Sequence, residues 1–454
     1  MDLTSRLRTI VRGNRPASAL PAGPGATPPD AGDSAIRELT YEPDVGRYEA
    51  TLDLDRVCQS LGGRTVSTKF GDCLVIDRRY ESDRRHGSMP IADCELARCD
   101  ALRLLDPSLS AAAARRTVFI DLETTGLSGG AGTVAFLVGC GYFDLGAFQV
   151  RQFLLTSFAA ERALLAAVAD FFADADLIVT YNGKTFDVPV METRWMFHRL
   201  AMPLDGVPHF DMLHPARRLW SSRTSASVST VDAGCRLSTL ERVLLDVRRV
   251  GDVQGFEIPS RFFRFLRSGD PRPLEPVLEH NRIDLVSLAA VTAHAVRLAQ
   301  DGASACRDSA EALALGRVYE RAGLLDRAHD CYRRAAQSES VELRGEALYR
   351  LGLRCRRDRR FPEAAECWRT LLELTESRSA RRSRTMKALR EFASEALAIH
   401  HEHRVRDLAA ARDLACFALE ETAGQGPRAD GMRHRLARLD RKIARRQSAH
   451  LFDS

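Results

Sequence analysis

The chain of 454 residues is poor in lysine, which occurs only at Lys69, Lys184, Lys387 and Lys442, so arginine supplies most of its 66 basic side chains. Long apolar runs are also missing, and none approaches the roughly 20 residues that a membrane-spanning helix needs. The N-terminus has no compact apolar stretch followed by a cleavage site, as a secretory signal would require. We therefore expect a cytoplasmic protein with no membrane attachment.

The eleven cysteines form no dense framework. Cys94 and Cys99 lie close together in a polar stretch, but no second pair completes a zinc pattern. We expect free, mostly buried thiols, with a zinc site as the alternative. A phosphate-binding G-x-x-x-x-G-K-[ST] loop is absent as well, which leaves nucleotide-driven transferase or helicase work without support.

Length and composition predict more than one domain. Residues 1–35 are rich in Pro, Gly and Ala, which is typical of a disordered tail. Residues 36–114 mix short apolar runs with polar turns and form an accessory segment of unknown role, which we interpret as a small β-containing prelude. Residues 115–298 have an α/β pattern, whereas helical periodicity dominates residues 305–447.

The α/β pattern predicts a mixed sheet flanked by helices. Four apolar runs predict strands, and the turn at Asp144–Gly146 joins the second to the third. The strands are expected at residues 117–120, 132–143, 148–155 and 177–180. Helical spacing is found at residues 161–176, 188–198, 238–247 and 279–298.

The helical region contains an internal repeat at a shift of 36 residues, which aligns Gly316 with Gly352 and Tyr332 with Trp368. Small residues at such positions let paired helices approach closely, and the aromatic rings fill the space between them. The pattern resembles tetratricopeptide repeats. A third unit, around Ala396–Leu419, is looser. Repeats of this kind commonly bind a protein partner, although here they could also brace the preceding domain.

The net charge of +5 is unevenly distributed. From Asp301 onward, 31 Lys and Arg residues face 24 Asp and Glu residues, a balance of +7, so the first 300 residues carry −2. This excess is compatible with nucleic acid or acidic partners, and equally with a solvated helical surface.

Three groups of acidic residues mark the α/β region. Asp121 and Glu123 stand two apart at a strand end, which places both on one face of the sheet. Two acids there repel each other unless cations lie between them; alternatively, the strand enters a turn and both reach water. His280 and Asp284 are four apart on a predicted helix and project from one side, as a surface pair also would.

The remaining acid, Asp187, follows the stretch TYNGKTF, which leaves the buried strand at residues 177–180. An N-cap role accounts for an Asp at a helix start, but not for the preceding Asn182 and Gly183, which suit a tight backbone approach to a ligand.

Taken in order, these motifs resemble the DnaQ-like DEDD exonuclease superfamily, which has an RNase H-like fold. LIVTYNGKTFDVPVMETR is similar to the second exonuclease motif of family B DNA polymerases, and HFDMLHPARRLW followed by LSTLE extends that similarity through Asp211 and Glu241. Together with the helical repeats, the chain resembles the bacterial YprB-type RNase H-like proteins.

The resemblance implies a metal-dependent exonuclease that acts 3′→5′ on single-stranded DNA or RNA. It implies two Mg²⁺ or Mn²⁺ ions held by Asp121, Glu123, Asp187 and Asp284. It also implies that His280 orients or deprotonates the water, and that Asn182 and Lys184 contact the terminal nucleotide or its phosphate. Thr124, also assigned to substrate binding, would shape the turn beside the metals together with Thr125 and Gly126. The alternative is a non-catalytic nucleic-acid-binding scaffold whose repeats recruit a protein partner.

One spacing departs from the family. In the histidine-type branch the His precedes the last Asp by five positions, and in the tyrosine-type branch a Tyr precedes it by four. Here His280 precedes Asp284 by four, which leaves its role as the base open. Arg194 is a further candidate for substrate contact or for packing. We expect Tyr181 in the core and Asp211 as a supporting or packing acid.

Overall fold

The computed structural model describes residues 52–96, 100–109, 115–126, 132–225, 235–376, 378–421 and 427–452. The predicted tail at residues 1–35 lies outside them, as does Cys99. The cysteines in the described ranges are free thiols, and most of them are buried, as predicted.

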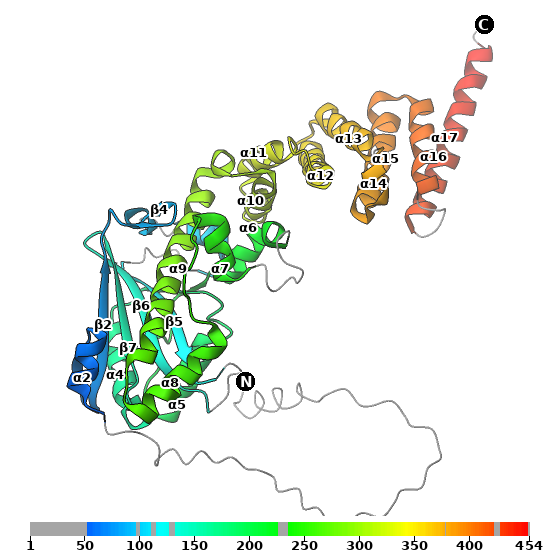
Figure 1. Ribbon diagram of the computed structural model, residues 1–454. Helices are drawn as coiled ribbons and strands as arrows, with labels where there is room; N and C mark the ends of the chain where they lie inside the picture. The colour runs from blue at the N-terminus through cyan, green and yellow to red at the C-terminus, as the bar shows by residue number, and fades with distance from the viewer. Residues whose placement is uncertain are drawn as a thin grey trace, which may run out of the picture. The chain divides into compact units, whose positions relative to one another are not determined.

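Seven strands form a mixed sheet in the order β1-β2-β7-β6-β5-β8-β9 (Figure 1). Pairing is parallel between β5 and β8 and between β8 and β9, and antiparallel elsewhere in this sheet. The predicted mixed sheet is therefore confirmed. The strands are β1 (Arg64–Thr68), β2 (Gly71–Tyr80), β5 (Thr117–Thr124), β6 (Ala135–Asp144), β7 (Ala147–Leu154), β8 (Leu177–Thr180) and β9 (His209–Asp211).

The accessory segment contributes strands to this same sheet. Strand β2 pairs with β7 from Leu74 opposite Leu154 to Tyr80 opposite Phe148, and β1 pairs with β2. A separate ribbon of β3 (Arg85–His86) and β4 (Met89–Pro90) leads into a 3₁₀ turn at Ile91–Cys94. The domain boundaries proposed from the sequence stay predictions.

Helices cover both faces of the sheet because side chains along β5 alternate between two apolar cores. Phe119 packs in one core with α9, whereas Val118 and Ile120 pack in the other with α4 and α8. Figure 1 shows α9 crossing the sheet. The helices of this region are α2 (Leu54–Leu61), α3 (Asp100–Leu105), α4 (Glu161–Phe172), α5 (Asp187–Phe197), α6 (Leu213–Ser225), α7 (Leu237–Leu240), α8 (Ile258–Ser268) and α9 (Glu275–Asp301).

The three parallel strands β5, β8 and β9 end at the same edge of the sheet. Thr180 lies opposite Asp211 at the ends of β8 and β9. Strand β5 continues past its last pair with β8, Phe119 opposite Val179, through Asp121 to Thr124. Open α/β sheets bind ligands at the carboxyl ends of their strands. This edge is therefore where the fold brings the acidic motifs together.

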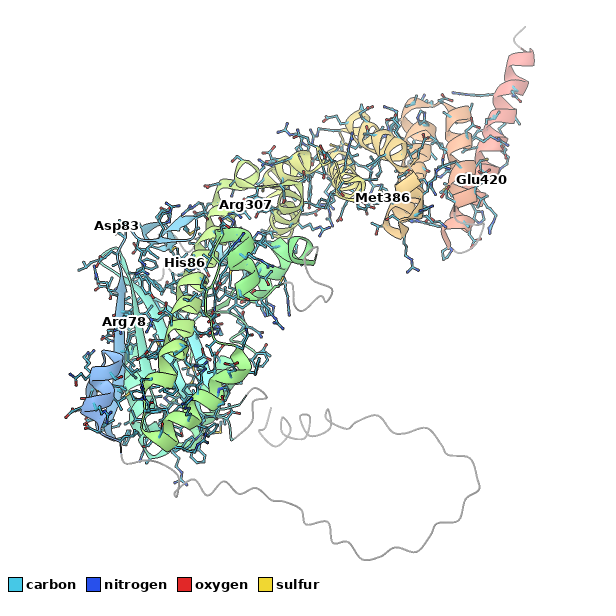
Figure 2. The ribbon with its side chains drawn as sticks, viewed as in Figure 1. Arg78, Asp83, His86, Arg307, Met386 and Glu420 are labelled. Carbon is cyan, nitrogen blue, oxygen red and sulfur yellow. The ribbon has the colours of Figure 1, made fainter. Side chains whose placement is uncertain are left out.

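Helix α9 is also anchored from the accessory segment. The Nε2 atom of His86 on β3, which is labelled in Figure 2, lies 2.7 Å from the hydroxyl of Ser287, a fully buried residue of α9. This contact fixes the middle of the helix that carries His280 and Asp284.

The rest of the chain is helical, as predicted. A Cβ atom added to Gly316 would lie 2.5 Å from the Tyr332 ring, and one added to Gly352 would lie 2.2 Å from Nε1 of Trp368. The same close approach thus recurs at the predicted shift of 36 residues. The helices are α10 (Ser309–Arg321), α11 (Leu325–Ala335), α12 (Val341–Arg357), α13 (Phe361–Thr375), α14 (Arg378–Arg382), α15 (Arg384–His400), α16 (Leu408–Glu421) and α17 (Pro427–Phe452). Over the described ranges, no helix combines the length and apolar character needed to cross a bilayer.

The first helices of this region bind the carbonyl end of α9. The Tyr319 hydroxyl donates to the carbonyl of Ala299 at 2.8 Å, and Arg327 donates to the carbonyl of Gln300. Basic groups at a helix C-terminus complement its dipole. The helix that crosses the sheet is therefore hydrogen-bonded directly to the helical region.

A buried carboxylate attaches the last helix, α17. The Glu402 side chain, in a π-helical turn at His401–Val405, accepts hydrogen bonds from Arg435, Arg438 and Lys442 at 2.7–2.9 Å. Burial alone would raise the pKa of Glu402, but hydrogen bonds from Arg438 and Lys442, with the charges of Arg438 and His403, lower it to about 2. Because the pKa is lowered on folding, this cluster stabilises the fold above about pH 4.5 and loses that effect as the pH falls toward 2.

We predict that Glu402→Gln destabilises the packing of α17 by about 2 kcal/mol near pH 7. This is less than the roughly 3–5 kcal/mol of a fully buried pair, because Arg438 and Lys442 are each 43% exposed. The difference from the wild type should shrink between pH 4.5 and pH 2. Hydrogen exchange of α17 peptides at pH 7 and thermal melts at pH 7 and pH 3 measure it. Glu421→Gln, which removes an acid bonded to Arg390, is the matched control with a smaller expected effect. If the stability difference between Glu402→Gln and the wild type did not change with pH, the ionised Glu402 carboxylate would not be what stabilises α17.

Candidate carboxylate site

Strand β5 supplies two acids to the sheet edge. Asp121 and Glu123 lie on the face that α9 covers, as their spacing predicts, and Glu123 is buried. The Asp121 carboxylate accepts a hydrogen bond from Nδ2 of Asn281 on α9 at 2.8 Å. The strand register shifts between Glu123 and Thr124, an irregularity typical of strands next to active sites.

Asp187 reaches the same edge through a constrained turn after β8. Asn182 has a φ of +66°, and a Cβ on Gly183 would lie 2.5 Å from the Thr180 side chain, so only glycine fits there. The buried Asp211 carboxylate accepts hydrogen bonds from the backbone N–H groups of Asn182 at 2.8 Å and Lys184 at 3.0 Å. Asp211 therefore supports the turn that delivers Asp187.

Helix α9 supplies His280 and Asp284, one turn apart on the same side. Nε2 of His280 lies 3.4 Å from Oδ2 of Asp284. Its other ring nitrogen, Nδ1, lies 2.7 Å from Oδ1 of Asp252. A pocket of about 180 Å³ is lined by Asp121, Leu122, Glu123, Thr124, Gly255, Ile258, Pro259, His280 and Asp284. Five of the residues predicted for the site thus meet at one cavity.

The four acids interact through their charges. Burial, and then the charges of Asp284, Glu123 and Asp187, raise the pKa of Asp121 well above its usual range. The pKa of Glu123 is raised in the same way, and burial with nearby acids raises that of Asp187 to about 7, despite backbone hydrogen bonds that oppose the shift. The edge therefore holds more negative charge than its surroundings offset, which a bound cation would relieve.

Arg249 also contacts this cluster, although no sequence motif predicted it. Its Nη2 donates to both Asp284 and Glu241, and its Nη1 lies 3.0 Å from Oδ2 of Asp252. The residue lies in an irregular segment between the π-helical turn Glu241–Leu245 and α8. No periodic pattern marks that segment, so neither Arg249 nor Asp252 could be found by spacing.

A second group missed by sequence reasoning crosses three strands. Gly139 lies opposite both Asp121 and Gln152 in the sheet register. The fully buried Asn281 side chain lies over Gly139, and its Oδ1 accepts a hydrogen bond from Nε2 of Gln152 at 2.8 Å. Asn281 thereby fixes the orientation of the Asp121 carboxylate.

The structure places other predicted residues away from this pocket. Lys184 is exposed, and its Nζ lies 3.3 Å from a carboxylate oxygen of Asp106. Asn182 belongs to the turn and does not line the pocket. Thr124, which does line it, donates from its hydroxyl to the carbonyl of Gly126 at 2.7 Å.

Arg194 and Tyr181 have packing roles. The guanidinium of Arg194 is buried and forms two hydrogen bonds of 2.6 Å with Glu161, which joins α5 to α4. Tyr181 is half-buried, and its hydroxyl donates to the carbonyl of Cys235.

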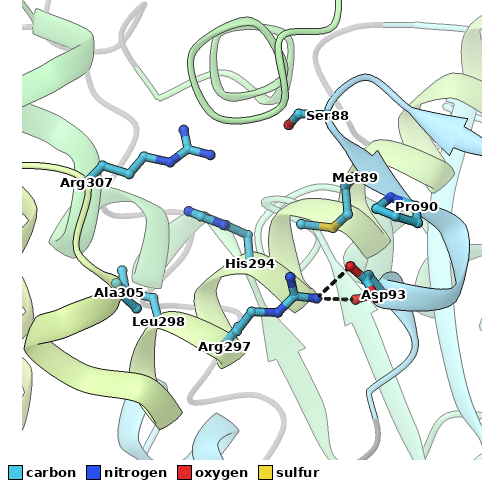
Figure 3. Close-up of a pocket in the computed structure, with 9 residues that line it drawn as sticks. All are labelled: Ser88, Met89, Pro90, Asp93, His294, Arg297, Leu298, Ala305 and Arg307. Carbon is cyan, nitrogen blue, oxygen red and sulfur yellow. Dashed lines mark hydrogen bonds and ion pairs between the residues drawn. The ribbon is translucent and has the colours of Figure 1, made fainter.

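A separate pocket of about 260 Å³ lies further along α9 (Figure 3). There His294 and Arg297 of α9 face Met89 and Asp93, and Arg297 is 3.6 Å from a carboxylate oxygen of Asp93. His294 is 14 residues beyond His280, or about 20 Å along a helix. This pocket contains none of the predicted site residues.

The acids at the sheet edge fit a divalent cation by their chemistry. Carboxylate oxygens are the hard ligands that Mg²⁺ and Mn²⁺ prefer, and these acids raise one another's pKa. As they stand, no three His, Cys, Asp or Glu side chains among the described residues are arranged to hold a metal ion. Asp284 instead contacts Arg249, and Asp121 contacts Asn281.

Comparison with known proteins identifies the class of this domain. Residues 118–296 match the family described as the RNase_H superfamily. This match spans β5, the parallel strands, and α9 through Val296, so it includes all the acids of the cluster. The RNase H superfamily indicates a nuclease, a hydrolase that acts on nucleic acid, and nucleases of this fold generally use divalent metal ions.

The similarity to one bacterial protein extends well beyond this domain. "Uncharacterized protein YprB" of Bacillus subtilis (strain 168) is 31% identical over 383 residues, which cover 82% of this chain and 86% of that protein. The chain therefore belongs to the YprB family.

We predict that Gly139→Ala lowers the free energy of unfolding by about 1–3 kcal/mol, as overpacking does. The added Cβ would lie 2.1 Å from Oδ1 of Asn281 and would displace that side chain from Asp121. Gly132→Ala, where a Cβ would have no neighbour within 4 Å, is the control and should stay within about 0.5 kcal/mol of the wild type. Urea denaturation of both variants measures the difference.

A double-mutant cycle tests the cause of this effect. In an Asn281→Ala background the clash is removed, so Gly139→Ala should cost much less than in the wild type. If Gly139→Ala lowered the free energy of unfolding equally in the wild type and in Asn281→Ala, the added Cβ would clash with a group other than Asn281.

Proposed function

We propose that this chain is a metal-dependent exonuclease that hydrolyses phosphodiester bonds of single-stranded DNA or RNA. The observation that carries the proposal is the convergence of Asp121, Glu123, His280 and Asp284 on one pocket, with Asp187 in the same electrostatic cluster. The superfamily match supports nuclease chemistry. The DEDD type and the 3′→5′ polarity rest on the resemblance of the sequence motifs.

The acids would hold the metal ions. Asp121, Glu123, Asp187 and Asp284 are the residues we assign as ligands of two Mg²⁺ or Mn²⁺ ions. When bound, such ions lower the pKa of water and stabilise the leaving oxygen. Asn281 orients the Asp121 carboxylate, and Asp211 supports the turn that carries Asp187.

His280 is placed to accept a proton. Its Nδ1 is 2.7 Å from Asp252, so the neutral ring donates Nδ1–H to that carboxylate and keeps the lone pair on Nε2. Nε2 is on the side of Asp284, and His280 lines the pocket. A histidine oriented by a carboxylate in this way suits a general base for the attacking water.

The helical region is proposed to consist of tetratricopeptide-like repeats. The recurring contacts of Gly316 with Tyr332 and of Gly352 with Trp368 support this interpretation. A protein partner for these repeats stays a prediction, as do the substrate role of Lys184 and Asn182 and the cytoplasmic location.

We predict that the Asp121→Ala/Glu123→Ala variant loses cleavage of labelled single-stranded DNA and RNA in Mg²⁺ or Mn²⁺. The loss should exceed the roughly 10–100-fold that removing an outer-shell partner costs. Labelling each oligonucleotide end in turn gives the polarity from stepwise shortening. Asp144→Asn, at the turn between β6 and β7, is the acidic control and should cleave like the wild type. Retained binding without cleavage by the wild type would favour the scaffold alternative.

We predict different losses at the two ends of the Asp252–His280 pair. His280→Ala should lower kcat by roughly 10²–10⁴, the typical contribution of a general base. Asp252→Asn should lower it by roughly 10–100-fold, with little change in KM, because it only orients the ring. Gln300→Ala, an exposed position near the far end of the same helix, should keep the wild-type kcat. A fully active His280→Ala variant would show that another group activates the water.

A further inference from the structure

Arg249 is the only basic side chain bonded to the acid cluster among the described residues, apart from His280. Its guanidinium contacts Glu241, Asp252 and Asp284, and its side chain is only 10% exposed. One fixed positive charge is thus shared among three acids at the edge of the pocket.

The carboxylate of Glu241 fixes the orientation of the Arg249 guanidinium. The contact is bidentate, with Nε of Arg249 2.8 Å from Oε2 and Nη2 bonded to Oε1. Glu241 is 1% exposed, and Asp246, with a φ of +57°, ends the π-helical turn so that the chain folds back toward it. A guanidinium fork matches a carboxylate in this geometry. The outer nitrogens of Arg249 therefore point toward Asp252, Asp284 and His280.

The arginine divides the cluster into two unequal halves. On one side, the charge and hydrogen bond of Arg249 oppose the rise in the pKa of Asp284. On the other side, the described residues place no cation in hydrogen-bonding contact with Asp121 or Glu123, and the Asp121 carboxylate accepts a bond from the neutral amide of Asn281. The charge of Arg249 opposes the rise in the pKa of Glu123 without a hydrogen bond. The second half therefore has the stronger demand for an added cation.

We propose that Arg249 is a resident counter-ion of the metal site, which competes with one of the two divalent ions for Asp284. The inference rests on the proposed metal-dependent function. An ion held by Asp121, Glu123 and Asp187 alone would displace no hydrogen-bonded basic side chain from these three acids. An ion that takes Asp284 as a ligand would bind more weakly, because it would have to replace the contact of Asp284 with Arg249. Without a bound ion, the charge of Arg249 offsets the repulsion between Glu241, Asp252 and Asp284.

The test is a titration of the full chain with Mn²⁺ alone, in which isothermal titration calorimetry measures the affinity of each binding step. The wild type should show one tight and one weak binding step. In Arg249→Gln the weak step should tighten by roughly tenfold or more, the equivalent of a charge-assisted hydrogen bond that no longer competes. Without metal this variant should melt at a lower temperature than the wild type, and Mn²⁺ should raise its melting temperature by more.

Two further variants separate competition from simple loss of structure. Arg151→Gln removes another arginine that is bidentate to one acid, Asp77, across the neighbouring strands β7 and β2. It should lower the melting temperature and leave both Mn²⁺ affinities unchanged. Arg249→Lys keeps the charge but loses the fork, and its weak step should lie between those of the wild type and Arg249→Gln. If Arg249→Gln does not fold, the lysine variant decides alone.

Each outcome gives an answer. Equal Mn²⁺ affinities in the wild type and in the Arg249 variants would overturn the counter-ion role and leave the proposed nuclease function standing. Two steps of equal affinity in the wild type would also overturn it. Absence of Mn²⁺ binding to the wild type would overturn both proposals.

Discussion

The structure around the candidate site depends on how mutual repulsion between buried acids is tolerated. Asp121, Glu123, Asp187 and Asp284 gather where the parallel strands end, and burial raises the pKa of each. An isolated acid cluster of this kind opposes folding. Three devices offset the cost here: the amide of Asn281, the backbone hydrogen bonds to Asp187, and the guanidinium of Arg249. A site that is costly when empty has a correspondingly large gain on binding cations.

Helix α9 links this site to the rest of the chain. Near its start it carries His280, Asn281 and Asp284, while its end is bound by Tyr319 and Arg327 from the helical region. Because α9 is continuous from Glu275 to Asp301, a single helix connects the acids to the helical region.

Sequence reasoning succeeded where the signal was local. The buried strands β5 and β8 and the long helix α9 follow from apolar runs and helical spacing, and the paired acids follow from period-2 alternation. It failed where position depends on distant pairing. Strand β2 reads as a short apolar run among charged residues, and only its pairing with β7 makes it part of the sheet. Arg249 and Asp252 lie in an irregular segment, so their contacts with α9 exist only after folding.

The unusual spacing of His280 now has a geometric interpretation. A helix turns by about 100° per residue, so positions four apart are separated by about 40° and positions five apart by about 140°. The spacing of four therefore places His280 beside Asp284, with 3.4 Å between the two side chains. A histidine so close to a buried carboxylate needs an independent support that fixes its ring. Asp252 provides it at 2.7 Å from the irregular segment, and Arg249 of the same segment contacts Asp284. The four-residue spacing of His280 and Asp284 and the contacts of Asp252 and Arg249 with this pair thus form one hydrogen-bonded group.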